Sequence, residues 1–110
     1  MNITKVIISN FMLEAQECYK LLSQITKGRV TTYKEIAKAM NSNAHRAVGS
    51  LIGKNPNAPK VPCHRVIKSD GAIGGYAFGI SKKIDLLKQE GLEIEDNKIK
   101  NFKQIIYKFS

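Results

Sequence analysis

The first regular pattern along the chain is a run of hydrophobic residues at the three- and four-residue spacing of an α-helix. These positions fall on one stripe of the helix surface, which predicts an amphipathic helix with that stripe buried. The stripe ends before Gly28 and consists of Phe11, Ala15, Cys18, Leu22 and Ile25. Because Cys18 lies on the buried stripe, we expect it to be an inert core cysteine.

Two shorter helices are predicted next, joined by a polar turn at residues 41–43. Thr31 and Thr32 carry hydroxyls that can cap the first amide groups of one helix. The apolar positions of that helix are Ile36, Ala37 and Met40. The inner face of the other helix, which ends at Gly53, consists of Ala44, Val48, Leu51 and Ile52. Two short helices joined by a tight turn predict a helix-turn-helix.

The second half of the chain predicts short strands around one further helix. Residues 66–68 and 72–73 flank an Asp-Gly turn, which is the pattern of a β-hairpin. Ser81 is placed to cap a helix that ends at Gly91 and buries Ile84 and Leu87. Residues 93–110 indicate a small hairpin or docked segment. The predicted fold is mainly α with a small β-hairpin, a single winged-helix-like domain over residues 1–110.

The charge of the chain favours a polyanion as its partner. The 110 residues hold 18 Lys and Arg against 9 Asp and Glu, a formal net charge of +9, which attracts nucleic acid. A generally basic soluble protein is the alternative. No apolar stretch approaches the ~20 residues that a membrane span needs, and the start lacks a signal-peptide layout. We therefore expect a cytoplasmic protein, at the nucleoid if prokaryotic, that binds no membrane and has free thiols.

Cys63 is the residue best placed for chemistry. It stands in the run Pro62-Cys63-His64-Arg65-Val66, at the end of a loop that holds the chain's three prolines. A free thiol with a pKa of about 8.5 is only slightly ionised at neutral pH, and a nearby imidazole or guanidinium increases the thiolate fraction. Because neighbours in an extended chain point to opposite faces, we expect a water to relay the proton. The run predicts a nucleophilic cysteine.

This run resembles the acceptor motif of the O6-alkylguanine-DNA alkyltransferases, also called methylated-DNA–protein-cysteine methyltransferases. Other landmarks of the family follow in the same order between about Phe11 and Leu92, at residues 28–37, 46–49, 55–56, 74–76 and 86–91. The resemblance implies an alkyltransferase domain that repairs DNA by direct reversal. It would move a methyl or alkyl group from O6 of a flipped-out guanine to Cys63, with O4 of thymine as a second candidate, and each molecule would react once.

The resemblance also implies a role for each residue of the catalytic group. Cys63 would be the acceptor thiolate, His64 would take its proton through a water, and Glu90 would polarise the imidazole. Tyr33 would donate to the guanine as charge develops on the departing base, and Lys83 would add positive potential. We expect no cofactor and no metal.

A second group of residues would bind the DNA and shape the pocket. Arg46 would fill the space left by the flipped base, from a recognition helix that lies in the minor groove. Asn55 would be a structural hinge before the acceptor loop, and Phe78 would narrow the pocket. The other DNA contacts would come from Thr32, Tyr33, Ala47, Gly49 and Ser50. The remaining pocket residues would be Val66, whose carbonyl accepts from the guanine amino group, Tyr76 and Ala77.

The implied partner is double-stranded DNA containing O6-alkylguanine, bound by a monomer. Many relatives carry a separate amino-terminal domain, whereas this sequence has only about ten residues before its first predicted helix. We therefore expect the catalytic domain to stand alone here. An alkyltransferase-like protein that only binds lesions is one alternative, and Cys63 argues against it. A winged-helix regulator would leave residues 62–65 and Glu90 unexplained. A buried inert Cys63 is disfavoured by the surrounding landmarks, and no zinc spacing is matched by Cys18, Cys63, His45 and His64.

Overall fold

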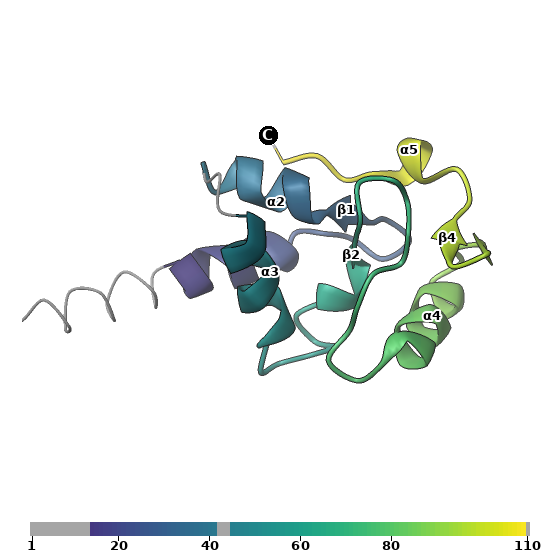
Figure 1. The fold of residues 1–110 in the computed structure, drawn as a ribbon, viewed down its shortest axis with the longest axis horizontal. Coiled ribbons are helices and arrows are strands. Elements are labelled where there is room, and N and C mark those ends of the chain that lie inside the picture. The colour runs from purple at the N-terminus through teal and green to yellow at the C-terminus, as the bar shows by residue number, and fades with distance from the viewer. Residues whose placement is uncertain (1–13, 42–44, 110) are drawn as a thin grey trace, which may run out of the picture.

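The computed structural model describes residues 14–41 and 45–109, and for residues 45 and 46 it describes the backbone alone. The described part of the first helix, residues 14–22, lies with α2 (Tyr33–Ala39) and α3 (His45–Gly53) at one end of the molecule (Figure 1). At the other end lies α4 (Ile80–Gln89). None of the helices in the described part of the chain has the length and apolar character that crossing a membrane requires.

The helices α2 and α3 form the predicted helix-turn-helix. Thr32 precedes α2, and its hydroxyl accepts a hydrogen bond from the Glu35 amide at 3.1 Å, which confirms the predicted cap. Ile36 and Ala37 of α2 are fully buried, and Val48 of α3 is almost so. The faces that the hydrophobic pattern predicted to be internal are therefore the packed faces.

A pair of two-residue strands, β1 (Thr31–Thr32) and β2 (Val66–Ile67), lies between the two ends of the molecule. The strands run parallel with Thr31 opposite Val66, and all four residues are buried. The predicted turn at residues 69–71 is present, since the Lys68 amide donates to the Ala72 carbonyl at 2.9 Å. The predicted strand pairing is wrong, because Val66–Ile67 pairs with β1 and Ala72 forms its bridge with Lys98. Two consecutive buried residues need cover on both faces of the strand, which the two hydrophobic clusters that contain Val66 and Ile67 provide.

The helix α4 begins and ends at glycines. Its N-cap is Gly79, with φ of 93° and no side-chain cap, so the predicted capping by Ser81 is wrong. The helix starts at Ile80, which leaves Ser81 inside its first turn. Gly91, also with φ of 93°, follows the C-cap Glu90 and ends the helix as predicted.

The C-terminal segment folds back onto β1. It forms the antiparallel hairpin of β3 (Ile94–Glu95) and β4 (Lys98–Ile99), then the short helix α5 (Phe102–Ile105). The chain then runs beside β1 (Figure 1), where Val30 and Ile106 form a parallel bridge. The predicted small hairpin and docked segment are both confirmed.

The core consists of two hydrophobic clusters. One lies around the helix-turn-helix and contains Cys18, Leu22, Ile25, Ile36, Ala37, Val48, Leu51, Ile52, Cys63 and Val66. The other lies beneath α4 and the C-terminal hairpin and contains Val30, Ile67, Ile73, Leu87, Leu92 and Ile99. Two residues predicted to be internal, Phe11 and Ala44, lie outside the described residues. The neighbours Val66 and Ile67 belong to different clusters, so β2 connects the two parts of the core.

The hydroxyl of Thr31 tests how strongly the C-terminal segment is held. Thr31 is fully buried and donates to the Tyr107 carbonyl at 2.9 Å. We predict that Thr31→Val lowers the free energy of unfolding by about 1 kcal/mol, because the carbonyl loses a buried donor. The melting temperature should fall by roughly 4–8 °C. Ser23→Ala is the matched control, since the Ser23 hydroxyl also donates to a carbonyl, at 3.0 Å, but is exposed. Equal melting temperatures for the two variants would contradict the prediction.

Candidate active site and DNA interface

Cys63 opens onto a pocket between α3 and the loop at residues 74–79. It begins a single turn of 3₁₀ helix, η1 (Cys63–Arg65), directly before β2. Its exposed fraction is 4%, and it lines a pocket with a volume of about 230 Å³. The lining consists of Tyr33, Gly49, Ile52, Gly53, Cys63, Gly75, Tyr76 and Ala77. The predicted nucleophile is therefore buried but faces a cavity.

Asn55 holds the loop that leads to Cys63. Its amide nitrogen Nδ2 donates to the Val61 carbonyl at 2.7 Å, and its Oδ1 accepts from the Asn57 amide at 3.1 Å. Its backbone amide donates to Ile52 in α3 at 3.2 Å. Asn55 is buried, so these bonds compete little with water. This residue therefore links α3 to the loop that precedes Cys63, and its role as a hinge stays a prediction.

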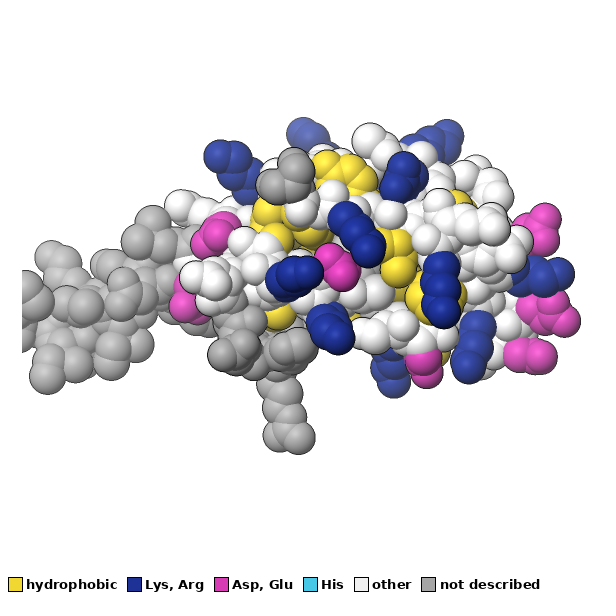
Figure 2. All heavy atoms as spheres, turned by 90° about the horizontal axis from the view of Figure 1, so that it is seen from above, with side chains coloured by type: hydrophobic (Ala, Val, Ile, Leu, Met, Phe, Trp, Pro, Cys, Tyr) yellow, Lys and Arg dark blue, Asp and Glu magenta, His cyan; other side chains and the backbone are white. Residues whose placement is uncertain are grey.

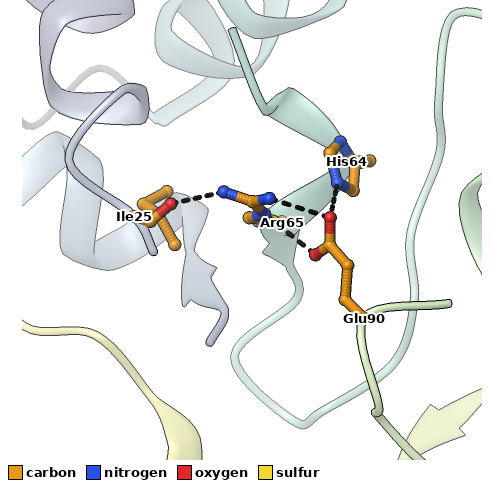
Figure 3. A network of polar contacts seen from close by, with 4 residues as sticks. All are labelled: Ile25, His64, Arg65 and Glu90. Carbon is orange, nitrogen blue, oxygen red and sulfur yellow. Dashed lines mark hydrogen bonds and ion pairs between the residues drawn. The ribbon is translucent and has the colours of Figure 1, made fainter. Parts of the chain in front are cut away.

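The carboxylate of Glu90 joins η1, here called the acceptor turn after the predicted role of Cys63, to the end of α4 (Figure 3). Its Oε2 lies 2.9 Å from His64 Nε2 and 2.8 Å from a terminal nitrogen of Arg65. Its Oε1 accepts from Arg65 Nε at 2.9 Å, so the Arg65 contact is bidentate. The other terminal nitrogen of Arg65 donates to the Ile25 carbonyl at 2.7 Å, just beyond the first helix.

The network determines how His64 is protonated. Burial favours the protonated acid at Glu90, but hydrogen bonds from Arg65 and His64 outweigh it and lower the pKa of this carboxyl. Burial also lowers the pKa of His64, although Glu90 opposes this shift. At neutral pH His64 is therefore a neutral imidazole whose Nε2–H donates to the ionised Glu90. The other ring nitrogen, Nδ1, is buried without a hydrogen-bond partner in the described part of the chain. Because Nε2 carries the proton of the neutral ring, Nδ1 is unprotonated and can accept one.

Lys83 is fully buried beside the pocket. Its Nζ donates to the carbonyl of Val66 at 2.6 Å and to that of Gly75 at 3.0 Å. Burial lowers the pKa of Lys83 to about 8, although attraction to a Cys63 thiolate acts in the opposite direction. Lys83 therefore connects β2 to the pocket loop and places a cation near Cys63. The Val66 carbonyl, predicted to accept from guanine, already accepts from this side chain.

The pocket contains most of the predicted substrate residues. Tyr33, Tyr76 and Ala77 line it, and burial raises the pKa of the Tyr33 hydroxyl, which keeps this group a donor at neutral pH. Val66 is absent from the lining. The prediction that Phe78 narrows the pocket is wrong, because its side chain is 62% exposed and lies outside the lining. It follows pocket-lining Ala77 on a turn that directs it outward.

The residues predicted to contact DNA come from the end of β1, the start of α2 and α3. Gly49 lines the pocket, and Ala47 and Ser50 are exposed on α3. Thr32 is buried and its hydroxyl caps α2, so it is less available to DNA than predicted. Arg46 lies in the first turn of α3, and its side chain is outside the described atoms. On the face seen in Figure 2, lysine and arginine side chains are spread widely between a few acidic ones.

Cys18 differs from Cys63 in its surroundings. Both are free thiols, but Cys18 is fully buried in the helical cluster and burial raises its pKa to about 12. A thiol with so high a pKa is protonated at neutral pH and unreactive, in agreement with the prediction. Within the described residues no group of three or more His, Cys, Asp or Glu side chains is arranged to hold a metal ion.

Comparison with known proteins identifies the family. The sequence-family model named 6-O-methylguanine DNA methyltransferase, DNA binding domain, matches residues 14–92. This range includes the helix-turn-helix, Cys63 and Glu90. The chain belongs to this family. The methylated-DNA–protein-cysteine methyltransferase of Methanosarcina barkeri is 49% identical over 73 residues, which are 66% of this chain and 46% of that protein. The bifunctional methyltransferase/endonuclease of Picrophilus torridus is 44% identical over 82 residues, 74% of this chain and 28% of that protein. The alkyltransferase-family chain thus spans less than half the length of either relative.

Two solved structures have folds similar to that of this alkyltransferase-family chain. Mycobacterium tuberculosis OGT in complex with DNA is similar with a TM-score of 0.67 and 44% identity, over 69% of this chain and 48% of that one. S. pombe Atl1 in complex with damaged DNA containing O6-carboxymethylguanine has a TM-score of 0.75 and 29% identity. The Atl1 match covers 87% of this chain and 95% of that one. The mainly helical helix-turn-helix fold predicted from the sequence is confirmed.

Arg65 is the functional residue whose role the sequence did not predict. The pattern shows it as a cation next to Cys63, whereas the structure directs its guanidinium to Glu90 and Ile25. In the predicted extended strand, Arg65 and His64 would point to opposite faces. The 3₁₀ turn brings both side chains to one carboxylate in this alkyltransferase fold. The available signal was Pro62, whose restricted backbone favours a turn.

The network predicts how Glu90→Gln changes the titration of His64 in the alkyltransferase-family chain. Both the hydrogen bond and the charge of Glu90 raise the pKa of His64 against the effect of burial. A neutral amide should therefore lower that pKa further, which an NMR pH titration of the His64 ring protons measures. Ser81→Ala, on the exposed first turn of α4, is the control and should leave the titration unchanged. A raised or unaltered pKa in Glu90→Gln would refute the proposed coupling.

Proposed function

We propose that this protein repairs DNA by moving the alkyl group of an O6-alkylguanine onto Cys63, once per molecule. The observation that carries the proposal is Cys63 lining a pocket next to His64, whose imidazole is held by Glu90. This is the arrangement of a nucleophile, a base and a residue that orients the base. Relatives named as methylated-DNA–protein-cysteine methyltransferases support the same reaction.

The reaction begins with proton removal from the acceptor. His64 Nδ1 takes the Cys63 thiol proton through a water, and the ion pair with Glu90 stabilises the imidazolium that forms. The cation of Lys83, held on the Val66 and Gly75 carbonyls, favours the thiolate. His64 is suited to this step because burial keeps its pKa low and its Nδ1 unprotonated.

The thiolate sulfur then attacks the alkyl carbon of the lesion. The S–C bond forms as the bond between the carbon and O6 breaks, and the electron pair of that bond passes to the guanine. Tyr33 donates to the base as this negative charge develops, and the proton held on His64 returns to the base through solvent. The products are unmodified guanine and a Cys63 thioether. Both the alkyl group and the acceptor are consumed, so the reaction is stoichiometric.

The partner proposed for this reaction is double-stranded DNA, with the alkylated nucleotide turned out of the helix into the pocket. Unstacking a nucleotide costs a few kcal/mol, and Arg46 would offset this cost by occupying the vacated space. Gly49 and Gly53 leave open space at the α3 surface, since a Cβ at either position would meet no other atom within 4 Å. A monomer of this size suffices for the contact.

A second candidate function is lesion binding without transfer. The similarity to S. pombe Atl1 over 95% of that chain favours this function on grounds of overall architecture. The thiol at position 63 and the imidazole beside it favour transfer, because a protein that only binds the lesion has no need of a nucleophile.

Intact-protein mass spectrometry distinguishes the two functions. After incubation with a duplex containing O6-methylguanine, the protein should gain the mass of one methyl group at Cys63. Cys63→Ser should gain none and still bind the duplex, while Cys18→Ser should be methylated like the wild type, because Cys18 is a protonated core thiol. Undamaged duplex is the control. Lesion binding by the wild type without a mass increase would show that the protein belongs to the binding-only class.

The role of Arg46 is tested by comparing two substrates. We predict that Arg46→Ala slows the reaction with an O6-methylguanine duplex by about tenfold or more, since only the duplex must be held open. The reaction with free O6-benzylguanine base should be nearly unaffected. Single-turnover rates of methyl or benzyl incorporation measure both effects, and Lys88→Ala on the exposed face of α4 is the control. Equal losses on the two substrates are incompatible with this role.

A further inference from the structure

Phe78 and Ile80 are the most exposed large hydrophobic side chains in the described structure, with exposed fractions of 62% and 51%. They lie on either side of Gly79, at the point where the pocket loop meets α4. Single exposed apolar residues are common on protein surfaces, so what bears on a contact is where these two lie relative to the pocket.

The position of Phe78 is set by the turn that carries it. The Gly79 amide donates to the Tyr76 carbonyl at 3.0 Å, which closes the loop directly before α4. The ring of Phe78 lies edge-on against that of Tyr76, with 5.5 Å between centroids and an angle of 74° between the planes. Phe78 directly follows Tyr76 and Ala77, which line the pocket, and is itself exposed and outside the lining, so it lies beside the pocket.

The pocket beside this pair has exposed lysines and a surface formed by glycines. Lys54 directly follows pocket-lining Gly53, Lys82 lies in the first turn of α4, and both lysines are exposed. Across the pocket, the α3 surface at Gly49 and Gly53 has no Cβ atoms. Exposed apolar side chains beside a pocket that exposed lysines flank match a DNA groove, whose sugar and base edges lie between two rows of phosphates.

We infer that Phe78 and Ile80 form an apolar contact with the sugar and base edges next to the flipped nucleotide. The inference rests on the proposed function, because it places the contact beside the lesion pocket. The two side chains cover the edge of the opened base stack on the loop side, while α3 approaches it from the opposite side of the pocket. This contact stabilises the opened duplex and is not needed by a free base.

The test measures single-turnover rates of the wild type and four variants on two substrates, an O6-methylguanine duplex and free O6-benzylguanine base. Phe78→Ala and Ile80→Ser should each slow the duplex reaction by about tenfold, the effect typical of losing one aromatic or apolar contact to a base. The rate with the free base should stay within about twofold of wild type, as should both rates of the Lys88→Ala control. Phe78→Trp, added as a fourth variant, should retain the duplex rate because it keeps an aromatic face.

Three results would overturn the inference. A faster reaction of Phe78→Ala with the free base would make Phe78 a gate of the pocket. Equal losses on both substrates, with an unchanged melting temperature, would assign the pair to pocket packing. Unchanged rates on both, with a lower sedimentation coefficient than wild type, would show that the pair contacts a second copy of the chain.

Duplex binding separates this inference from the proposed function. In the Cys63→Ser background, where no transfer is expected, Phe78→Ala should weaken binding to the O6-methylguanine duplex by about tenfold and leave binding to undamaged duplex nearly unchanged. If the wild type transfers no alkyl group but this loss of lesion binding is observed, the proposed function fails and the contact stands. If transfer occurs and both affinities are unchanged, the contact fails and the proposed function stands.

Discussion

The carboxylate of Glu90 is the interaction on which the site depends most. It accepts from both side chains that follow Cys63, and through Arg65 it is connected to the Ile25 carbonyl after the first helix. Arg65 is 16% and Glu90 10% exposed, so the pair is largely withdrawn from water. Removing one partner of such a pair leaves an uncompensated charge, which is far more costly than losing a surface ion pair. The same bonds that orient the imidazole therefore hold the acceptor turn against α4 and the first helix.

The acceptor turn also lies where the two halves of the core meet. Cys63 and Val66 pack in the helical cluster, whereas Ile67 packs in the cluster beneath α4. Asn55 connects this turn to α3, and Lys83 connects β2 to the pocket loop. We therefore expect a change in volume at Cys63 to affect both α3 and the loop that borders the pocket, because a close-packed interior deforms little.

Overall architecture and sequence identity favour different relatives of this chain. The TM-score with S. pombe Atl1 is higher than that with M. tuberculosis OGT, although the identity is lower. The C-terminal segment after Leu92 lies outside the family match, and its Ile106 forms a bridge with Val30, directly before β1. A shared fold therefore does not by itself distinguish lesion binding from alkyl transfer, and the proposed distinction rests on the thiol at position 63.

Local patterns in the sequence determined much of this molecule. The helical periodicity, the cap at Thr32 and the glycine after Glu90 were predicted from neighbours within a few residues, because capping and amphipathic packing are local effects. The run at residues 62–66 and its resemblance to a known acceptor motif led to Cys63, His64 and Glu90 before any contact was known.

Only the tertiary structure decided which residues meet across long distances in the sequence. The parallel pairing of β1 with β2, the docking of Ile106 beside Val30 and the bidentate contact of Arg65 with Glu90 join segments that no local pattern relates. The direction of Phe78 was also decided by the tertiary structure. The resemblance gave its position in the loop and predicted that it would narrow the pocket, but the turn directs it to solvent. Local propensity specifies a conformation, whereas the burial of apolar surface and the pairing of buried charges depend on the whole fold.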